Sequence, residues 1–146
     1  MCLCVGTVHL SLFIFSECEP SSYSFGGSCY SFATDVETMD MAKSACETQG
    51  THLVYIETLQ EQEYLTRRLS ALGGSADYWI GIEKNDCGDH VWMDGSALSY
   101  SNLGSTMDQG GKCLRLTSEN NYDKWLEETC TNQYRYVCEK NIGNCP

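Results

Sequence analysis

The chain has 146 residues, a formal net charge of −11 and 10 cysteines. Its length fits one domain, and its acidic balance argues against nucleic acids and anionic membrane surfaces as partners, because both require a basic face. There is no Cys-x-x-Cys pair and no histidine at zinc spacing from the cysteines. The cysteines therefore favour a disulfide-stapled domain from an oxidising, extracellular compartment.

Residues 1–16 are apolar and nearly uncharged, with a continuous apolar run over 12–15. Such a segment is too short to span a bilayer and is typical of a secretory signal peptide. No Lys or Arg precedes the run, and the one place with small residues at both cleavage positions lies after Cys18. A trimmed N-terminus of a longer precursor is therefore the alternative. We expect a signal peptide over 1–16 and the folded domain over 17–146.

The next stretch predicts a hairpin over residues 18–33. The stretch Ser24-Phe25-Gly26-Gly27-Ser28 provides the turn, and Tyr30-Ser31-Phe32 alternate as a strand does. A helix should follow, because apolar residues then recur on one helical face before Gly50 stops the pattern. The residues on that face are Met39, Ala42, Ala45 and Cys46.

A second helix is expected to begin at Thr58. Thr58 and Glu61 form the Ser/Thr-x-x-Glu pattern of a capping box, and the helical pattern ends at Gly73-Gly74. We expect its apolar side to face the core through four leucines. These are Leu59, Leu65, Leu69 and Leu72.

The run 77–82, Asp-Tyr-Trp-Ile-Gly-Ile, is apolar on both faces and predicts a strand that is buried on both sides. Gly81 in its interior indicates a bulge or a close backbone approach. A polar loop over 83–89 should follow, then a short apolar run over 91–93 and a turn at Asp94-Gly95.

From 96 to 112 the chain is rich in Ser, Gly, Asn, Asp and Gln. A loop of this length inside a compact domain is usually functional or disordered, and we interpret it as functional. Three strands, expected to be antiparallel, should then complete the domain over 112–116, 124–126 and 135–138.

The order and spacing of these motifs resemble the C-type lectin-like domain in its long form. Trp79-Ile80-Gly81-Ile82, Trp92-Met93-Asp94-Gly95-Ser96 and Tyr136-Val137-Cys138-Glu139-Lys140 carry the resemblance, which covers about 18–140. It implies an α+β fold in which two helices flank small antiparallel sheets, with a long loop region and disulfide staples.

The same resemblance implies the disulfide pairing, which spacing alone cannot decide. The implied bonds join Cys18 to Cys29, Cys46 to Cys138 and Cys113 to Cys130. Cys87 and Cys145 are left unassigned. A bond between them is not favoured, because the family fold would place them at opposite ends. Two further states stay open for these cysteines, which are free thiols and a disulfide-linked oligomer through Cys87 or Cys145.

Many members of this family bind sugar through Ca²⁺, which needs six to eight oxygen ligands. In those relatives a Glu-Pro-Asn or Gln-Pro-Asp triplet and an Asn-Asp pair after a strand tryptophan supply the oxygens. Here Met107-Asp108-Gln109 lacks the proline, and Leu126-Glu127 follow Trp125. We therefore expect the usual calcium-dependent sugar motif to be degenerate. A weak or structural Ca²⁺ site stays open, against the alternative of a solvated acidic face.

The long-loop region is still the expected binding surface. Asp108 and Glu127 are the candidate metal ligands. The candidate ligand contacts are Asn102, Asp108, Gln109, Glu127 and Glu128.

Catalysis is not expected, because His52 and His90 have no partner nucleophile in a recognisable motif and no phosphate-binding loop is present. The leading hypothesis is a secreted recognition module for a glycan or an extracellular protein surface, with no membrane insertion. The alternatives are a calcium-dependent lectin of innate immune recognition with a rearranged site, and an acidic matrix or mineral-associated protein.

Overall fold

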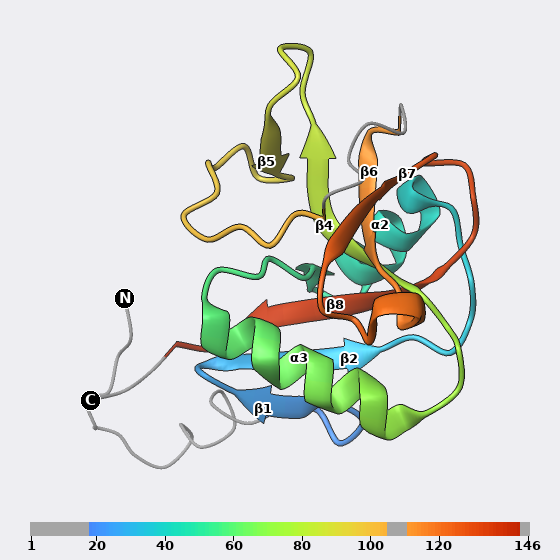
Figure 1. The fold of residues 1–146 in the computed structure, drawn as a ribbon. Coiled ribbons are helices and arrows are strands. Elements are labelled where there is room, and N and C mark those ends of the chain that lie inside the picture. The colour runs from blue at the N-terminus through green and yellow to red at the C-terminus, as the bar shows by residue number, and fades with distance from the viewer. Residues whose placement is uncertain (1–17, 105–110, 144–146) are drawn as a thin grey trace.

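The computed structural model describes residues 18–104 and 111–143, and its elements follow the labels of Figure 1. Within these residues two helices and eight strands make an α+β fold, as expected from the sequence. Their bounds are β1 Tyr23–Phe25, β2 Ser28–Phe32, α2 Met39–Thr48, β3 His52–Leu53, α3 Leu59–Leu72, β4 Tyr78–Lys84, β5 His90–Trp92, β6 Cys113–Leu116, the 3-10 turn η1 Ser118–Asn120, β7 Trp125–Glu128 and β8 Arg135–Asn141.

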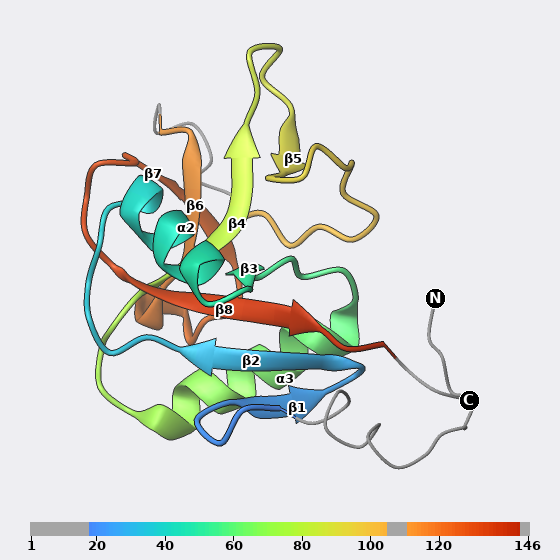
Figure 2. The same ribbon diagram turned by 180° about the vertical axis from the view of Figure 1, so that it is seen from behind.

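The strands form one hydrogen-bonded path in the order β1-β2-β8-β4-β6-β7, with β3 on β8 and β5 on β4. In Figures 1 and 2 the helices lie on opposite sides of the β2–β8 layer, while the β4–β5 hairpin projects away from it. The sequence predicts that the last three strands are antiparallel. β6 pairs antiparallel with β7, and β8 pairs antiparallel with β2 and β3. In addition β8 pairs in parallel with β4, Tyr78 opposite Arg135, and it is adjacent to neither β6 nor β7 in the path.

The predicted central strand is confirmed, since residues 78–82 of β4 are all buried. A Cβ added at Gly81 would lie 2.7 Å from the Leu53 carbonyl oxygen, so the β3 segment can approach β4 only because this residue has no side chain. The register between β4 and β6 shifts between Trp79 and Glu83, which is the predicted irregularity. The expected polar loop begins later than predicted, because Glu83 and Lys84 still belong to β4.

The first predicted helix is confirmed as α2, which buries Met39, Ala42 and Cys46. Thr38 caps its N-terminus by accepting from the Met41 amide. Gly50 follows the helix with a φ of 76°, a conformation that suits glycine at a helix end.

The second predicted helix is confirmed as α3, with Thr58 accepting from the Glu61 amide at 3.0 Å. Leu65 and Leu69 are fully buried, but the expectation for the other two leucines is wrong. Leu59 is 51% exposed and Leu72 is 48% exposed, because both lie at the helix ends, beyond the neighbouring strands. Gln62 takes the buried place in the first turn instead.

The three implied disulfides are present, and each has Cα atoms 5.3–5.5 Å apart. The bond from Cys46 to Cys138 ties α2 to β8 across a sequence separation of 92 residues. A closed loop of that length stabilises the fold by about 4 to 5 kcal/mol in the chain-entropy model. Within residues 18–104 and 111–143, no helix is long and apolar enough to cross a membrane.

Candidate functional site

Residues from three strands meet beside the projecting β4–β5 hairpin, and we call this region the loop end. Lys84 on β4 pairs directly with His90 on β5, so their side chains lie on the same face. On the other side of β4, β6 pairs with β7 and places Leu114 opposite Glu127. These registers bring Lys84, His90 and Glu127 together from positions far apart in the sequence.

Glu127 is the centre of this cluster, and its side chain has no exposed area. One carboxylate oxygen, Oε2, accepts from Lys84 Nζ at 2.6 Å and lies 3.0 Å from His90 Nε2. The other oxygen, Oε1, is buried and has no hydrogen-bond partner. Burial raises the pKa of Glu127, but the hydrogen bonds and charges of Lys84 and His90 outweigh burial and hold that pKa below its usual range.

The described residues around Glu127 do not fit a calcium ion. Calcium takes six to eight oxygen ligands, several of them carboxylate. Here one carboxylate oxygen already binds two nitrogen donors, which leaves a single unpartnered oxygen. Nowhere in residues 18–104 and 111–143 do three or more His, Cys, Asp or Glu side chains form a group that could hold a metal.

Glu128, the neighbouring candidate contact, lies in a separate network at the end of β7. Its Oε2 accepts from Arg115 Nε at 2.9 Å and from the Tyr134 hydroxyl at 2.7 Å. Its Oε1 accepts from the Thr129 amide and from Asn132 Nδ2. Burial raises the pKa of Glu128, yet these partners keep it below its usual range. Both oxygens are therefore occupied by the protein itself.

Arg115 extends this network to the central strand. Its Nη1 lies 2.6 Å from Asp77 Oδ2, and the Asp77 carboxylate also accepts from the Ser118 amide. The network links β4, β6 and β7, so it holds the strands that carry the loop end rather than presenting charges to solvent.

Asn102 occupies a different place, beside a surface hollow of about 380 Å³. Its side-chain amide donates to the Asp123 carbonyl oxygen, and its carbonyl oxygen accepts from Lys124 Nζ at 3.0 Å. Part of the α3 surface forms the opposite wall. The lining includes Leu59, Glu63, Arg67, Tyr100, Asn102 and Asp123.

Two tryptophans lie beneath these features and are fully packed. Trp92 and Trp125 contact one another edge to face, with ring centroids 5.7 Å apart. The Trp125 indole donates to Gln62 Oε1 at 2.7 Å, and Gln62 in turn donates to the Tyr122 carbonyl oxygen. Gln62 therefore fixes α3 to the strand that carries Glu127.

Asp108 and Gln109 lie outside the described residues, as does Cys145. Cys87 is exposed at the tip of the β4–β5 hairpin and has no disulfide partner among the described cysteines. Of the candidate contacts that are described, Glu127 and Glu128 lie in adjacent networks, whereas Asn102 faces the separate hollow.

Sequence reasoning misses the partners of Glu127. It places Lys84 in a polar loop and considers His90 only as a catalytic residue. The signal that could find them is the continuation of β4 through Glu83 and Lys84, followed by a turn over 85–89. That hairpin places Lys84 and His90 opposite one another.

Comparisons with known proteins agree with this architecture. Residues 35–140 match the family model described as Lectin C-type domain. The chain is 34% identical over 133 residues to C-type lectin domain family 4 member G of Mus musculus, and the match covers 85% of this chain but 43% of that protein. The chain thus spans less than half the length of this curated relative.

Two further matches cover most of this chain and most of the similar protein. The chain is 30% identical to Snaclec coagulation factor X-activating enzyme light chain 2 of Daboia siamensis, over 84% of this chain and 81% of the relative. Among solved structures, the Ca2+-independent C-type lectin SPL-2 from Saxidomus purpuratus superimposes with a TM-score of 0.79 at 27% identity. That match covers 87% of this chain and 96% of SPL-2.

Proposed function

This chain belongs to the C-type lectin domain family, and we propose that it is a non-enzymatic recognition module that binds a glycan or protein surface without calcium. The observation that carries the proposal is the 2.6 Å contact between Lys84 Nζ and Glu127 Oε2. Glu127 stands where sugar-binding relatives have a calcium-ligating aspartate. An internal ammonium group already neutralises this carboxylate, so a metal ion is not needed to compensate its charge.

The binding surface that we propose is the exposed part of the loop end together with the hollow at Asn102. Asn102, Asp108 and Gln109 remain the proposed polar contacts. Glu127 and Glu128 are assigned a supporting role instead, because their oxygens bind internal partners. Three disulfides support a secreted protein, since such bonds persist in oxidising compartments.

A glycan array run with calcium and with EDTA, beside a calorimetric calcium titration, tests the proposal. We expect no saturable calcium heat and the same array signals in both buffers. An array without any signal in either buffer would narrow the ligand to a protein surface. Saturable calcium binding with signals that EDTA removes would overturn the proposal in favour of a calcium-dependent lectin with a rearranged site.

We propose in addition that Cys87 can join two chains through a disulfide, because its thiol is exposed at a hairpin tip. Electrophoresis of the purified protein without reductant is expected to show a dimer that Cys87→Ser abolishes. A band that stays dimeric in the Cys87→Ser variant would assign the link to another cysteine, and a monomer in both would contradict the proposal.

A further inference from the structure

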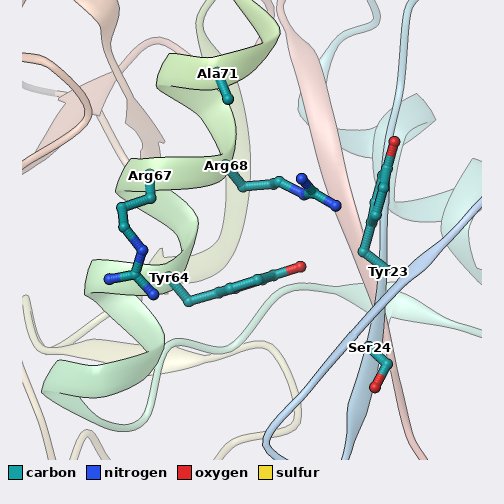
Figure 3. A pocket seen from close by; sticks show the side chains of 6 residues that line it. All are labelled: Tyr23, Ser24, Tyr64, Arg67, Arg68 and Ala71. Carbon is teal, nitrogen blue, oxygen red and sulfur yellow. The ribbon is translucent and has the colours of Figure 1, made fainter.

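A second cavity lies between α3 and β1, on the opposite side of the molecule from the β4–β5 hairpin (Figures 1 and 3). Its volume is about 430 Å³. Figure 3 shows Arg68 and Tyr64 reaching from α3 toward Tyr23 on β1, with Ser24 at the strand edge. Arg67, on the neighbouring position of α3, also lines the cavity, but its guanidinium points away from Arg68 and Tyr23.

Two arginines line this cavity. The protein carries 20 Asp and Glu against 9 Lys and Arg, and Lys43, Lys84 and Arg115 are paired with carboxylates. Within residues 18–104 and 111–143, neither Arg67 nor Arg68 takes part in an ion pair.

The Arg68 guanidinium lies over the Tyr23 ring, with its carbon 3.7 Å from the ring centroid. Such a contact orients the guanidinium but gives its N–H groups no acceptor. Arg68 Nε is buried and makes no hydrogen bond, and the buried Tyr64 hydroxyl beside it makes none either. A buried donor without an acceptor destabilises the protein, so the free protein already carries this cost.

The aromatic rings of the cavity have little free face to offer a ligand. Tyr64 stacks on Phe25 with centroids 4.4 Å apart and also contacts Tyr30. Tyr23 is covered by Arg68 and contacts Phe32. What remains for a ligand is a set of polar groups, which are the Arg68 guanidinium and the hydroxyls of Ser24, Tyr23 and Tyr64.

We propose that this cavity binds an acidic sugar residue, with its sulfate or carboxylate on Arg68 and its hydroxyls on the Tyr and Ser hydroxyls. An oxyanion gives the Arg68 donors the acceptors they lack, and guanidinium binds such groups in a bidentate manner. A saccharide fits better than a sulfated tyrosine, because a sugar needs hydroxyl partners rather than a free ring face. Arg67 also lines the hollow at Asn102, but Arg68, Tyr23 and Ser24 line only this cavity of the two, so the proposal does not rest on the function proposed for the loop end.

The test uses the full chain and NMR titration with N-acetylglucosamine 6-sulfate, N-acetylneuraminic acid, neutral N-acetylglucosamine and O-sulfotyrosine. The two acidic sugars distinguish a sulfate from a carboxylate. We expect at least one of them to shift the amide signals of Tyr23, Ser24 and 67–71, with the signals of 84–90 unchanged. Arg68→Gln is expected to weaken that binding at least tenfold, and Arg68→Lys less.

Lys43→Gln is the matched control, because it removes one exposed charge from α2 and should leave binding unchanged. If Arg68→Gln does not fold, Arg68→Lys is tested in the same way, because it keeps the positive charge over Tyr23 while it removes the buried Nε donor. Equal binding of neutral and acidic sugars, full binding by both arginine variants, or tighter binding of O-sulfotyrosine would each overturn the proposal. Shifts confined to the loop end would also overturn it, while leaving the loop-end function standing.

Discussion

Glu127 at the loop end and the pair Glu61 and Glu139 beneath α3 are all buried, but their partners differ in kind. Glu127 is held by Lys84 and His90. Glu61 accepts from the Tyr30 hydroxyl at 2.5 Å and from the Glu57 amide at 2.8 Å. Glu139 accepts from the Ser28 hydroxyl at 2.6 Å and from the Tyr55 amide, and the structure gives this pair no cation among the described residues.

The difference appears in the pKa values. Burial, and next the charge of Glu139, raise the pKa of Glu61 to about 7. Burial also raises the pKa of Glu139. Around Glu127 the cations reverse the effect of burial and lower the pKa. The Lys84 ammonium group thus compensates the negative charge of Glu127. In the pair Glu61 and Glu139, the repulsion between two buried carboxylates is removed most simply when one of them binds a proton.

The largest expected effect comes from removing the cation at the loop end. Lys84→Met leaves the Glu127 charge buried with only His90 beside it, and breaking a buried pair in this way costs about 3 kcal/mol. Urea unfolding at pH 7 measures the loss. Lys84→Met combined with Glu127→Leu should recover most of it, and Lys124→Met, at an exposed site, should cost under about 0.5 kcal/mol. A loss below about 1 kcal/mol for Lys84→Met would mean that the pair contributes little.

The second prediction concerns how the free energy of unfolding depends on pH through Glu61, which has no cation beside it in the described part of the chain. Since the pKa of folded Glu61 is about 7, against an ordinary value of 4.5, the folded chain holds more protons than the unfolded chain between these values. The contribution of Glu61 to the free energy of unfolding is therefore fully present below about pH 4.5 and is lost as pH rises through about 7. We expect the free energy of unfolding to fall by about 2 kcal/mol between pH 5 and pH 8.

Urea unfolding at the two pH values measures this change, and Glu61→Gln should remove most of it. Glu127 acts in the opposite direction and in another window, because a lowered pKa gives stability that is lost only as pH falls below about 4.5. Stability that stays flat or rises from pH 5 to pH 8 in the unaltered protein would contradict the prediction.

The smallest effect is expected from a single hydroxyl. Tyr30→Phe removes the hydrogen bond to Glu61, which costs about 1 kcal/mol at pH 8. Because that hydrogen bond lowers the pKa of Glu61, its loss should also move the pH transition upward. Tyr136→Phe is the matched control, since its hydroxyl contacts the exposed Asp35. An equal loss and an unchanged transition in both variants would rule out a special role for the Tyr30 hydroxyl.

The sequence determined the elements whose signals are local. The run 78–82, the two helical faces and the caps at Thr58 and Gly50 can be read from neighbouring residues, because propensity, burial and turn chemistry act over a few positions. The cysteine pairing followed from the family resemblance, which covers most of the chain. The hairpin turns and the glycine in β4 are also features that neighbouring residues predict.

Tertiary structure alone decided the contacts between distant positions. The parallel pairing of β4 with β8, the exposure of Leu59 and Leu72, and the meeting of Lys84 with Glu127 all depend on which strands become neighbours. The charge of a residue is visible in the sequence, but its partner is not. Whether a buried glutamate receives a cation or a proton is set by strand register, and a shift of one residue would turn Lys84 to the other face.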